Sequence, residues 1–225
     1  MLGLSITALL ANAIALLIGF TIHEASHAWM AYRLGDDTAK RMGRLSLNPL
    51  VHLDPLGTIM ALLMRFGWAK PTPVNPWRLR YGPRVGGALV ALAGPLSNLL
   101  LAAVAAVAWR LAYARVSLAD ISPLGYTFLF QVLGTIVVLN ILLFLFNLIP
   151  LAPLDGNSIL NGIVGARAAR ALAPLQTYGP QILMGLFLLS FLAPRFNILG
   201  TVLYPAMSGL LRVLVGPTLM NAFVF

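Results

Sequence analysis

A cluster of ionisable residues interrupts an otherwise apolar stretch near the start of the chain. His23, Glu24 and His27 form the pattern His-Glu-x-x-His, and Glu24 is the only glutamate in the sequence. On a helix, residues four apart lie on one face, one turn apart, so both imidazoles can bind one metal ion. Glu24 lies beside them, where it can hold and deprotonate a water molecule. The spacing predicts a zinc site with His23 and His27 as ligands and Glu24 as the catalytic base.

The alternative interpretation is a pair of core histidines with purely structural hydrogen bonds. An ionisable group at bilayer depth costs at least about 2.5 to 3.5 kcal/mol and usually marks a functional site. If Arg33 marks the interface, His27 and His23 precede it by six and ten residues. At a rise of about 1.5 Å per residue, they lie roughly 9 to 15 Å inside the membrane. We therefore interpret the cluster as functional.

A catalytic zinc ion usually has three protein ligands and a water molecule. The chain contains no cysteine, so the third ligand is sought among the aspartates Asp36, Asp37, Asp54, Asp120 and Asp155. The first two look like loop charges after a helix end, Asp120 falls in a loop on the opposite side, and Asp54 stays possible. Asp155 ends the run NLIPLAPLDG at 147–156, where prolines break an apolar helix. Such breaks at membrane depth line protein cavities, which favours Asp155 as the third ligand.

Two asparagines in apolar spans are candidates for contact with a substrate. Asn98 and Asn147 could hydrogen-bond the substrate backbone or the oxyanion that develops during hydrolysis. The alternative for both is hydrogen bonding between helices. The remaining histidine, His52, has no partner at ligand spacing and is interpreted as an interfacial polar residue outside the metal site.

The elements that position these residues must be membrane helices. The chain is 60% hydrophobic and 9% charged, whereas a soluble domain is about 45 to 50% apolar and about 25% charged. This composition excludes a soluble globular domain and predicts one membrane-embedded, all-α polytopic domain over residues 1–225, surrounded by a lipid bilayer. The net charge of +9 fits the excess of Lys and Arg in cytoplasmic loops, so no nucleic-acid partner is expected.

Five membrane spans are predicted, near residues 5–34, 86–109, 124–149, 178–193 and 197–215. The apolar segment 56–66 is too short to cross about 30 Å of hydrocarbon and is expected to be re-entrant or interfacial. The proline-rich segment 69–81 favours an extended chain and predicts a small membrane-surface β segment with an exposed edge. A helix of small residues is expected near 157–172. The basic residues between 33 and 84 place the active site toward the cytoplasm and the N-terminus outside.

These motifs together resemble the site-2 proteases, a family of intramembrane zinc metalloproteases. The resemblance rests on HEASH at 23–27, AGPLSN at 93–98 and NLIPLAPLDG at 147–156. They occur in the family's order and define a catalytic core over about 5–160, followed by C-terminal helices over about 174–215. The short interval from 98 to 147 excludes an inserted PDZ domain, and the apolar chain after 160 excludes a CBS pair. A compact member of the family is therefore expected.

The resemblance implies one Zn²⁺ per chain, bound by His23, His27 and Asp155. With zinc-activated water and Glu24 as general base and acid, such an enzyme cleaves a peptide bond in or near a transmembrane segment of a protein substrate, here in a prokaryotic inner membrane. The alternative is a divalent-metal transporter or metal-binding membrane protein with the same ligands. A transporter requires a polar path, which the spans after residue 84 do not show. A scaffold that only captures membrane helices would not require Glu24.

Overall fold

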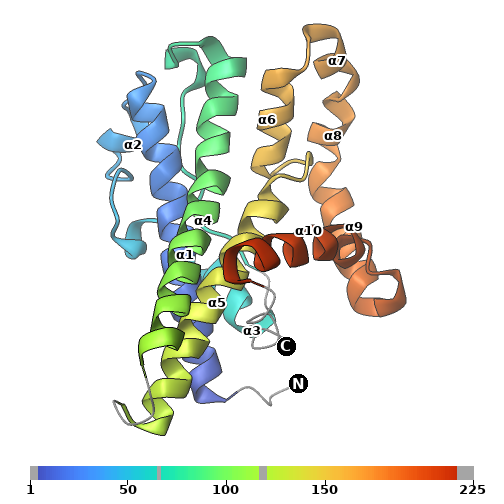
Figure 1. Ribbon diagram of the computed structural model, residues 1–225. Helices are drawn as coiled ribbons and strands as arrows, with labels where there is room; N and C mark the ends of the chain where they lie inside the picture. Colours follow the sequence, from blue (N-terminus) through green and yellow to red (C-terminus); the bar gives the residue numbers. More distant parts are fainter. Residues whose placement is uncertain (1–4, 65–66, 117–120, 217–225) are drawn as a thin grey trace.

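Three long helices form the centre of the molecule. The computed structural model describes residues 5–64, 67–116 and 121–216. Within them, α1 (Ile6–Arg33), α4 (Gly82–Arg115) and α5 (Pro123–Asn147) run side by side (Figure 1). The buried side chains between them are mostly small or β-branched: Ala15, Ala102, Ala105, Ala106, Ile136, Val137 and Ile141. Small residues let helix backbones approach closely inside a membrane, which explains the tight bundle.

The ends of α1 and α5 follow from their local sequences. The Ser5 hydroxyl accepts a hydrogen bond from the Ala8 amide at the start of α1, and the Ser122 hydroxyl accepts one from the Gly125 amide at the start of α5. Helix α1 ends at Arg33, and Gly35 has a φ of +103°. This is the left-handed conformation that glycine adopts after a helix, so the chain turns sharply there.

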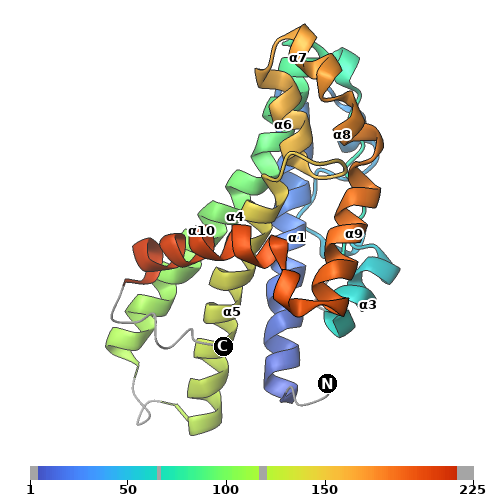
Figure 2. The ribbon, with the colours of Figure 1, turned by 90° about the vertical axis from the view of Figure 1, so that its right-hand side faces the viewer.

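Four helices of the described residues are long and apolar enough to cross a membrane, namely α1, α4, α5 and α10 (Ile198–Val215). This confirms an all-α, polytopic membrane protein. The fourth predicted span, near 178–193, corresponds to α9 (Gly179–Leu192), whose 14 residues extend about 21 Å at 1.5 Å per residue, less than the roughly 30 Å of hydrocarbon. Helix α10 lies across α4 and α5 rather than along them (Figure 2) and packs on them through Leu211 and Val215.

The surface region between α1 and α4 contains short elements: α2 (Thr38–Arg41), η1 (Pro49–Val51), α3 (Pro55–Met64) and η2 (Pro76–Arg78). Helix α3 has 10 residues and agrees with the short segment predicted at 56–66, of which residues 65–66 lie outside the described chain. The β segment is not confirmed: the described residues contain only an isolated antiparallel bridge between Leu53 and Ala69. Prolines at 71, 73 and 76 have no N–H to donate, so they remove donors from any ladder along this segment.

The chain after α5 forms three short helices instead of the single one expected near 157–172. They are α6 (Asp155–Ile163), α7 (Ala166–Ala171) and α8 (Ala173–Thr177). The short 3₁₀ helix η3 (Pro194–Phe196) joins α9 to α10. At the start of α6, a Cβ on Gly156 would lie 2.4 Å from the carbonyl oxygens of both Leu148 and Ile149. Glycine therefore allows α6 to begin directly against the end of α5.

A buried aspartate joins the end of α1 to the extended segment 69–75. Asp36 is fully buried, although a solvated loop charge was expected there. Its Oδ1 accepts hydrogen bonds from the Thr38 amide (3.0 Å) and hydroxyl (2.5 Å), and its Oδ2 accepts one from the Asn75 amide (2.6 Å). The expectation failed because one of the donors, the Asn75 amide, comes from a segment 39 residues away, which the local sequence does not reveal.

This aspartate makes the stability of the fold depend on pH. Burial raises the pKa of Asp36, but the hydrogen bonds from Thr38 and Asn75 outweigh it, so the pKa lies below its ordinary value. The ionised form therefore stabilises the fold above the unfolded pKa of about 3.9, and this stabilisation is lost as the pH falls through the folded pKa. We expect Asp36→Asn to lower the free energy of unfolding at pH 7 by about 1 to 3 kcal/mol, and the difference to shrink below about pH 4.

Denaturant unfolding in detergent at several pH values measures this difference. The matched control is Asp37→Asn, because the Asp37 carboxylate is about half exposed and pairs with Arg78 at 2.6 Å. Its loss should stay below about 1 kcal/mol. Equal losses for the two variants at pH 7 would contradict the role given to Asp36.

Candidate metal centre

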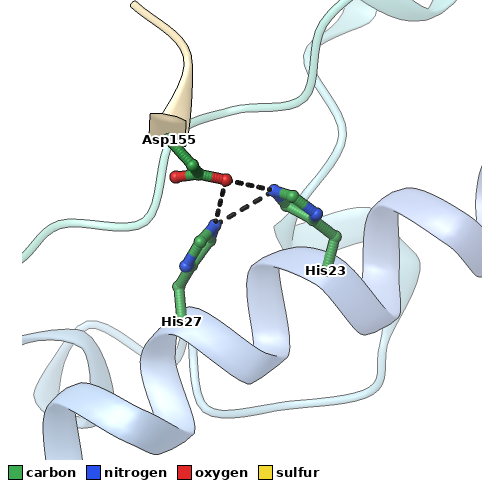
Figure 3. Close-up of side chains that lie close together, drawn as sticks. All are labelled: His23, His27 and Asp155. Carbon is green, nitrogen blue, oxygen red and sulfur yellow. Dashed lines mark hydrogen bonds and ion pairs between the residues drawn. The ribbon is translucent and has the colours of Figure 1, made fainter. Parts of the chain in front are cut away.

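Side chains from two elements far apart in the sequence converge on one point (Figure 3). His23 and His27 come from α1, and Asp155 is the first residue of α6. Asp155 Oδ2 lies 3.2 Å from His23 Nε2 and 3.3 Å from His27 Nε2, and the two Nε2 atoms are 3.0 Å apart. Tetrahedral zinc with bonds of about 2.0 to 2.2 Å separates its ligand atoms by about 3.3 to 3.6 Å. The spacing of these three atoms is therefore close to that of a zinc site.

The hydrogen bonds of the two imidazoles leave a lone pair on each Nε2 atom. His27 Nδ1 lies 2.8 Å from the Val90 carbonyl oxygen, and a carbonyl only accepts, so Nδ1 carries the proton. His23 Nδ1 donates in the same way to Asn98 Oδ1 at 2.6 Å. Asp155 Oδ2 is buried and accepts no hydrogen bond from a described residue. Three electron-pair donors without a proton between them repel one another, so the donor set fits a divalent cation.

Gly94 on α4 keeps space open beside the imidazoles. A Cβ at this position would lie 2.4 Å from His27 Nε2 and 2.7 Å from His23 Cε1. Both distances are well inside van der Waals contact, so a side chain here would push against both rings. The absence of a Cβ thus contributes directly to the shape of the metal centre.

Gly94→Ala is expected to lower zinc affinity by about 10- to 100-fold, the range seen when the surroundings of a metal ligand are disturbed. Competition with a chromophoric chelator measures the affinity. Gly87→Ala is the matched control on the same helix, because a Cβ there meets nothing within 4 Å, and it should bind zinc like the parent protein. An unchanged affinity in Gly94→Ala would show that the rings tolerate the added methyl group.

Glu24 is buried beside the triad of His23, His27 and Asp155, and the extended segment 69–75 holds its side chain. Its Oε2 accepts hydrogen bonds from the Thr72 amide at 2.9 Å and the Thr72 hydroxyl at 2.7 Å. The sequence analysis did not identify Thr72. The available signal was its position between Pro71 and Pro73, since the residue before a proline favours an extended conformation.

A cavity of about 720 Å³ contains the triad and Glu24 in its wall. Its apolar side is formed by Phe20, Leu143 and Phe146, from the spanning helices α1 and α5. Its polar side is formed mainly by Arg84, Asn157, Ser158 and Asn161. The metal centre is therefore reached through a space that is apolar toward the bundle and polar toward α6.

The two predicted asparagines have different surroundings. Asn98 is fully buried behind His23, and its Nδ2 donates to the Gly19 carbonyl (3.2 Å) and to Asn140 Oδ1 (2.7 Å). Both of its N–H groups are therefore engaged, and the geometry favours hydrogen bonding between helices over contact with an oxyanion. Asn147 lines the cavity, and its Nδ2 donates to the Leu143 carbonyl at 3.0 Å.

The other polar candidates lie outside the triad. Asp54 Oδ1 accepts a hydrogen bond from the Gly57 amide at 2.7 Å, at the start of α3. His52 is fully buried within the surface region, and its Nε2 donates to the Ser46 carbonyl at 2.7 Å. The buried Arg44, which the sequence analysis did not single out, donates to the Lys70 carbonyl. Asp120 lies outside the described residues.

The polytopic helical fold and the cluster of His23, His27 and Asp155 beside a glutamate fit a membrane metalloenzyme. The chain is 46% identical over 176 residues to the protein named "Putative zinc metalloprotease YwhC" of Bacillus subtilis. The aligned residues cover 77% of this chain and 78% of that protein. It is 30% identical over 187 residues to Rip2 of Mycobacterium tuberculosis, which carries the same designation, covering 80% of this chain and 66% of Rip2. No family model and no solved structure matches the chain.

The chain belongs to the site-2 protease family of zinc metalloproteases. Zinc is accordingly its metal cofactor. The resemblance found in the sequence is confirmed by these relatives.

Proposed function

We propose that this chain is an intramembrane endopeptidase that hydrolyses a peptide bond in or near a transmembrane segment of a membrane protein. The observation that carries the proposal is the position of the triad and Glu24 in the wall of one cavity formed partly by spanning helices. His23 and His27 lie within α1, roughly 9 to 15 Å from its end at Arg33. A substrate that already resides in the bilayer can reach this depth without leaving the hydrocarbon. By the positive-inside rule, the basic residues after α1 favour a cytoplasmic location for this end of the helix.

Hydrolysis at this site uses the residues in separate roles. His23, His27 and Asp155 would hold the zinc ion, which would supply Lewis-acid chemistry toward the scissile carbonyl and a water molecule. Glu24 accepts the proton of the attacking water and passes it to the leaving amine. Thr72 fixes the orientation of this carboxylate through the two hydrogen bonds to Oε2.

Asn147 contributes a polar group on the substrate side of the cavity. Its side chain lines the same cavity as Asp155 and Glu24. Asn147 is the last residue of α5 and the first residue of the proline-containing segment 147–156. An amide at this place can hydrogen-bond the substrate backbone or the developing oxyanion, a role that Asn98 cannot take because both of its N–H groups are engaged.

The two walls of the cavity suggest how a substrate lies in it. Phe20, Leu143 and Phe146 suit the apolar residues of a transmembrane segment, whereas Asn157, Ser158 and Asn161 suit the polar residues that follow such a segment. Cleavage near the end of a transmembrane segment matches this change in polarity. Segments whose polar flank is replaced by leucines should therefore be cleaved more slowly.

The extended segment 69–75 is proposed to bind the substrate backbone. A helical substrate must unwind before its carbonyl reaches the zinc, and pairing with an extended segment replaces the hydrogen bonds that it loses. Alternate residues of an extended chain face the same side, so Val74 shares a side with Thr72, whose N–H is held by Glu24. Pro71 and Pro73 have no N–H. Among the described contacts of residues 71–74, the Val74 N–H is the backbone donor left for a substrate.

Val74→Pro is expected to lower the cleavage of a helical substrate by about tenfold or more, the equivalent of one backbone hydrogen bond. Zinc content should not change, because Val74 is not among the three ligand residues. Val74→Ala, which retains the N–H, is the matched control. Asn75→Pro is less suitable because the Asn75 N–H holds Asp36. Equal cleavage by the Pro and Ala variants would exclude strand pairing at this residue.

Reconstitution into sealed vesicles with a single-span substrate tests the proposed function. We expect zinc-dependent cleavage near the end of the transmembrane segment, its loss upon chelation, and its return upon addition of zinc. The same vesicles report zinc transport through an enclosed indicator dye. Zinc uptake without proteolysis would favour the transporter alternative and contradict the proposal.

A further inference from the structure

Two fully buried asparagines link α5 to the metal centre. Asn140, on α5, donates from Nδ2 to the Ile136 carbonyl at 2.8 Å. Its Oδ1 accepts a hydrogen bond from Asn98 Nδ2, on α4, at 2.7 Å. Asn98 Nδ2 also donates to the Gly19 carbonyl of α1, and Asn98 Oδ1 faces His23 Nδ1. One continuous chain of hydrogen bonds thus runs through all three helices of the bundle.

The direction of every hydrogen bond in this chain is fixed from its far end. The Ile136 carbonyl only accepts, so the Asn140 amide nitrogen must face it, and Oδ1 must face Asn98. Asn98 therefore presents its nitrogen to Asn140 and its oxygen to His23. An amide oxygen also only accepts, so His23 Nδ1 must carry the proton and Nε2 must carry the lone pair.

We propose that Asn140 is a positioning residue for the zinc centre: it fixes the amide of Asn98 and thereby holds His23 in its metal-binding tautomer. This inference rests on the proposed role of His23 as a zinc ligand. Without Asn140, the Asn98 amide keeps only its longer hydrogen bond to the Gly19 carbonyl (3.2 Å) and can rotate more readily to present its N–H₂ group to His23 Nδ1. That arrangement favours the tautomer with the proton on Nε2, which competes with zinc.

The packing around Asn140 supports a specific role. A Cβ on Gly19 would lie 3.0 Å from Asn140 Oδ1 and 3.2 Å from Leu143 Cδ1, so glycine makes room for this amide. The same glycine provides the carbonyl that accepts from Asn98. The alternative is that Asn140 only holds the helices together, as polar residues in membranes often do. In that case its loss would weaken the bundle without changing the tautomer of His23.

Two measurements distinguish these roles. The chain has three histidines, so nitrogen NMR of labelled imidazoles in the zinc-free protein can assign the His23 proton to Nδ1 or Nε2. Chelator competition measures zinc affinity. For Asn140→Leu we expect the proton of His23 to shift at least partly to Nε2 and zinc affinity to fall about 10- to 100-fold.

The matched control is Asn12→Leu. Asn12 lies on α1, and its Nδ2 donates to the carbonyl four residues earlier at 2.9 Å, as Asn140 does at 2.8 Å. Its replacement should leave both readouts unchanged. Asn140→Asp is the rescue variant, because a carboxyl oxygen still accepts from Asn98 whatever its protonation state. It should keep the His23 proton on Nδ1 and zinc affinity within about threefold of the parent, which corresponds to about 0.7 kcal/mol.

An unchanged tautomer and affinity in Asn140→Leu would overturn the inference. If that variant does not fold, Asn140→Asp still decides, since a shift of its His23 proton to Nε2 would also overturn it. Failure of the proposed function has a different signature: His23→Ala would then bind zinc like the parent protein, or the parent would not cleave a membrane substrate. Cleavage by the parent with no effect of Asn140→Leu would refute only the positioning role.

Discussion

Glu24→Gln is expected to reduce cleavage of a reconstituted membrane substrate by about 10²- to 10⁴-fold, the contribution typical of general acid–base catalysis. Zinc should remain bound at about one ion per chain, because Glu24 is not among the three converging ligand atoms. A glutamine cannot accept the proton of water, yet it has nearly the same shape. Its amide oxygen still accepts the hydrogen bonds from Thr72 that hold the extended segment in place.

Initial cleavage rates and metal content of the same preparation measure the two halves of this prediction. Asp37→Asn, a carboxylate-to-amide change at an exposed ion pair, is the control and should retain both. If Glu24→Gln cleaved the substrate at the parent rate, Glu24 would not be the base. If it lost its zinc as well, the residue would be a ligand or a structural anchor of the site.

Asp155→Asn is expected to lower zinc affinity by more than 100-fold, beyond the roughly 10- to 100-fold seen when an outer-shell partner is removed. The change removes the only anionic ligand and leaves two neutral imidazoles. An amide oxygen is a much weaker ligand for zinc than a carboxylate. Cleavage should be lost at ordinary zinc concentrations and partly restored at high zinc concentrations.

Asp54→Asn is the matched control, because Asp54 was the other aspartate that the sequence left open as a ligand. Its Oδ1 accepts a hydrogen bond from Gly57, which an asparagine can also accept, so the fold should be preserved. Titration of both variants with zinc against a chelator gives the comparison. A stronger loss in Asp54→Asn than in Asp155→Asn would mean that the third ligand was assigned to the wrong aspartate.

The metal centre could be predicted from the sequence because its parts carry local signals. The spacing of His23 and His27 places both on one helical face without knowledge of any other contact. Asp155 required one further step, the argument that prolines breaking an apolar run must line a cavity. The structure brings the three side chains together as this argument expected.

The surroundings of the centre could not be predicted because they depend on contacts between distant segments. Nothing near Asp36 or His52 in the sequence indicates that both are fully buried. Asn98 was visible as an amide in an apolar span, but its partners Gly19 and Asn140 come from two other helices. An extended conformation at 69–75 followed from prolines, whereas the same prolines lack the N–H groups that a regular β ladder uses.

The length of an apolar stretch did not predict the direction in which its helix runs. The apolar stretch of α10 is long enough to cross a membrane, yet the helix lies across α4 and α5 (Figure 2). Composition describes which environment a helix tolerates, and its direction is decided by the neighbours on which it packs. Leu211 and Val215 provide those contacts here.

X-ray absorption fine structure at the zinc edge of the loaded protein tests the central claim most directly. The account predicts two imidazole ligands, recognisable by scattering from their outer ring atoms, together with oxygen ligands at about 2.0 to 2.2 Å. In His27→Ala, loaded at high zinc concentration, one imidazole should disappear. A parent spectrum with fewer than two imidazoles, or one that His27→Ala leaves unchanged, would contradict the claim that these side chains hold the ion.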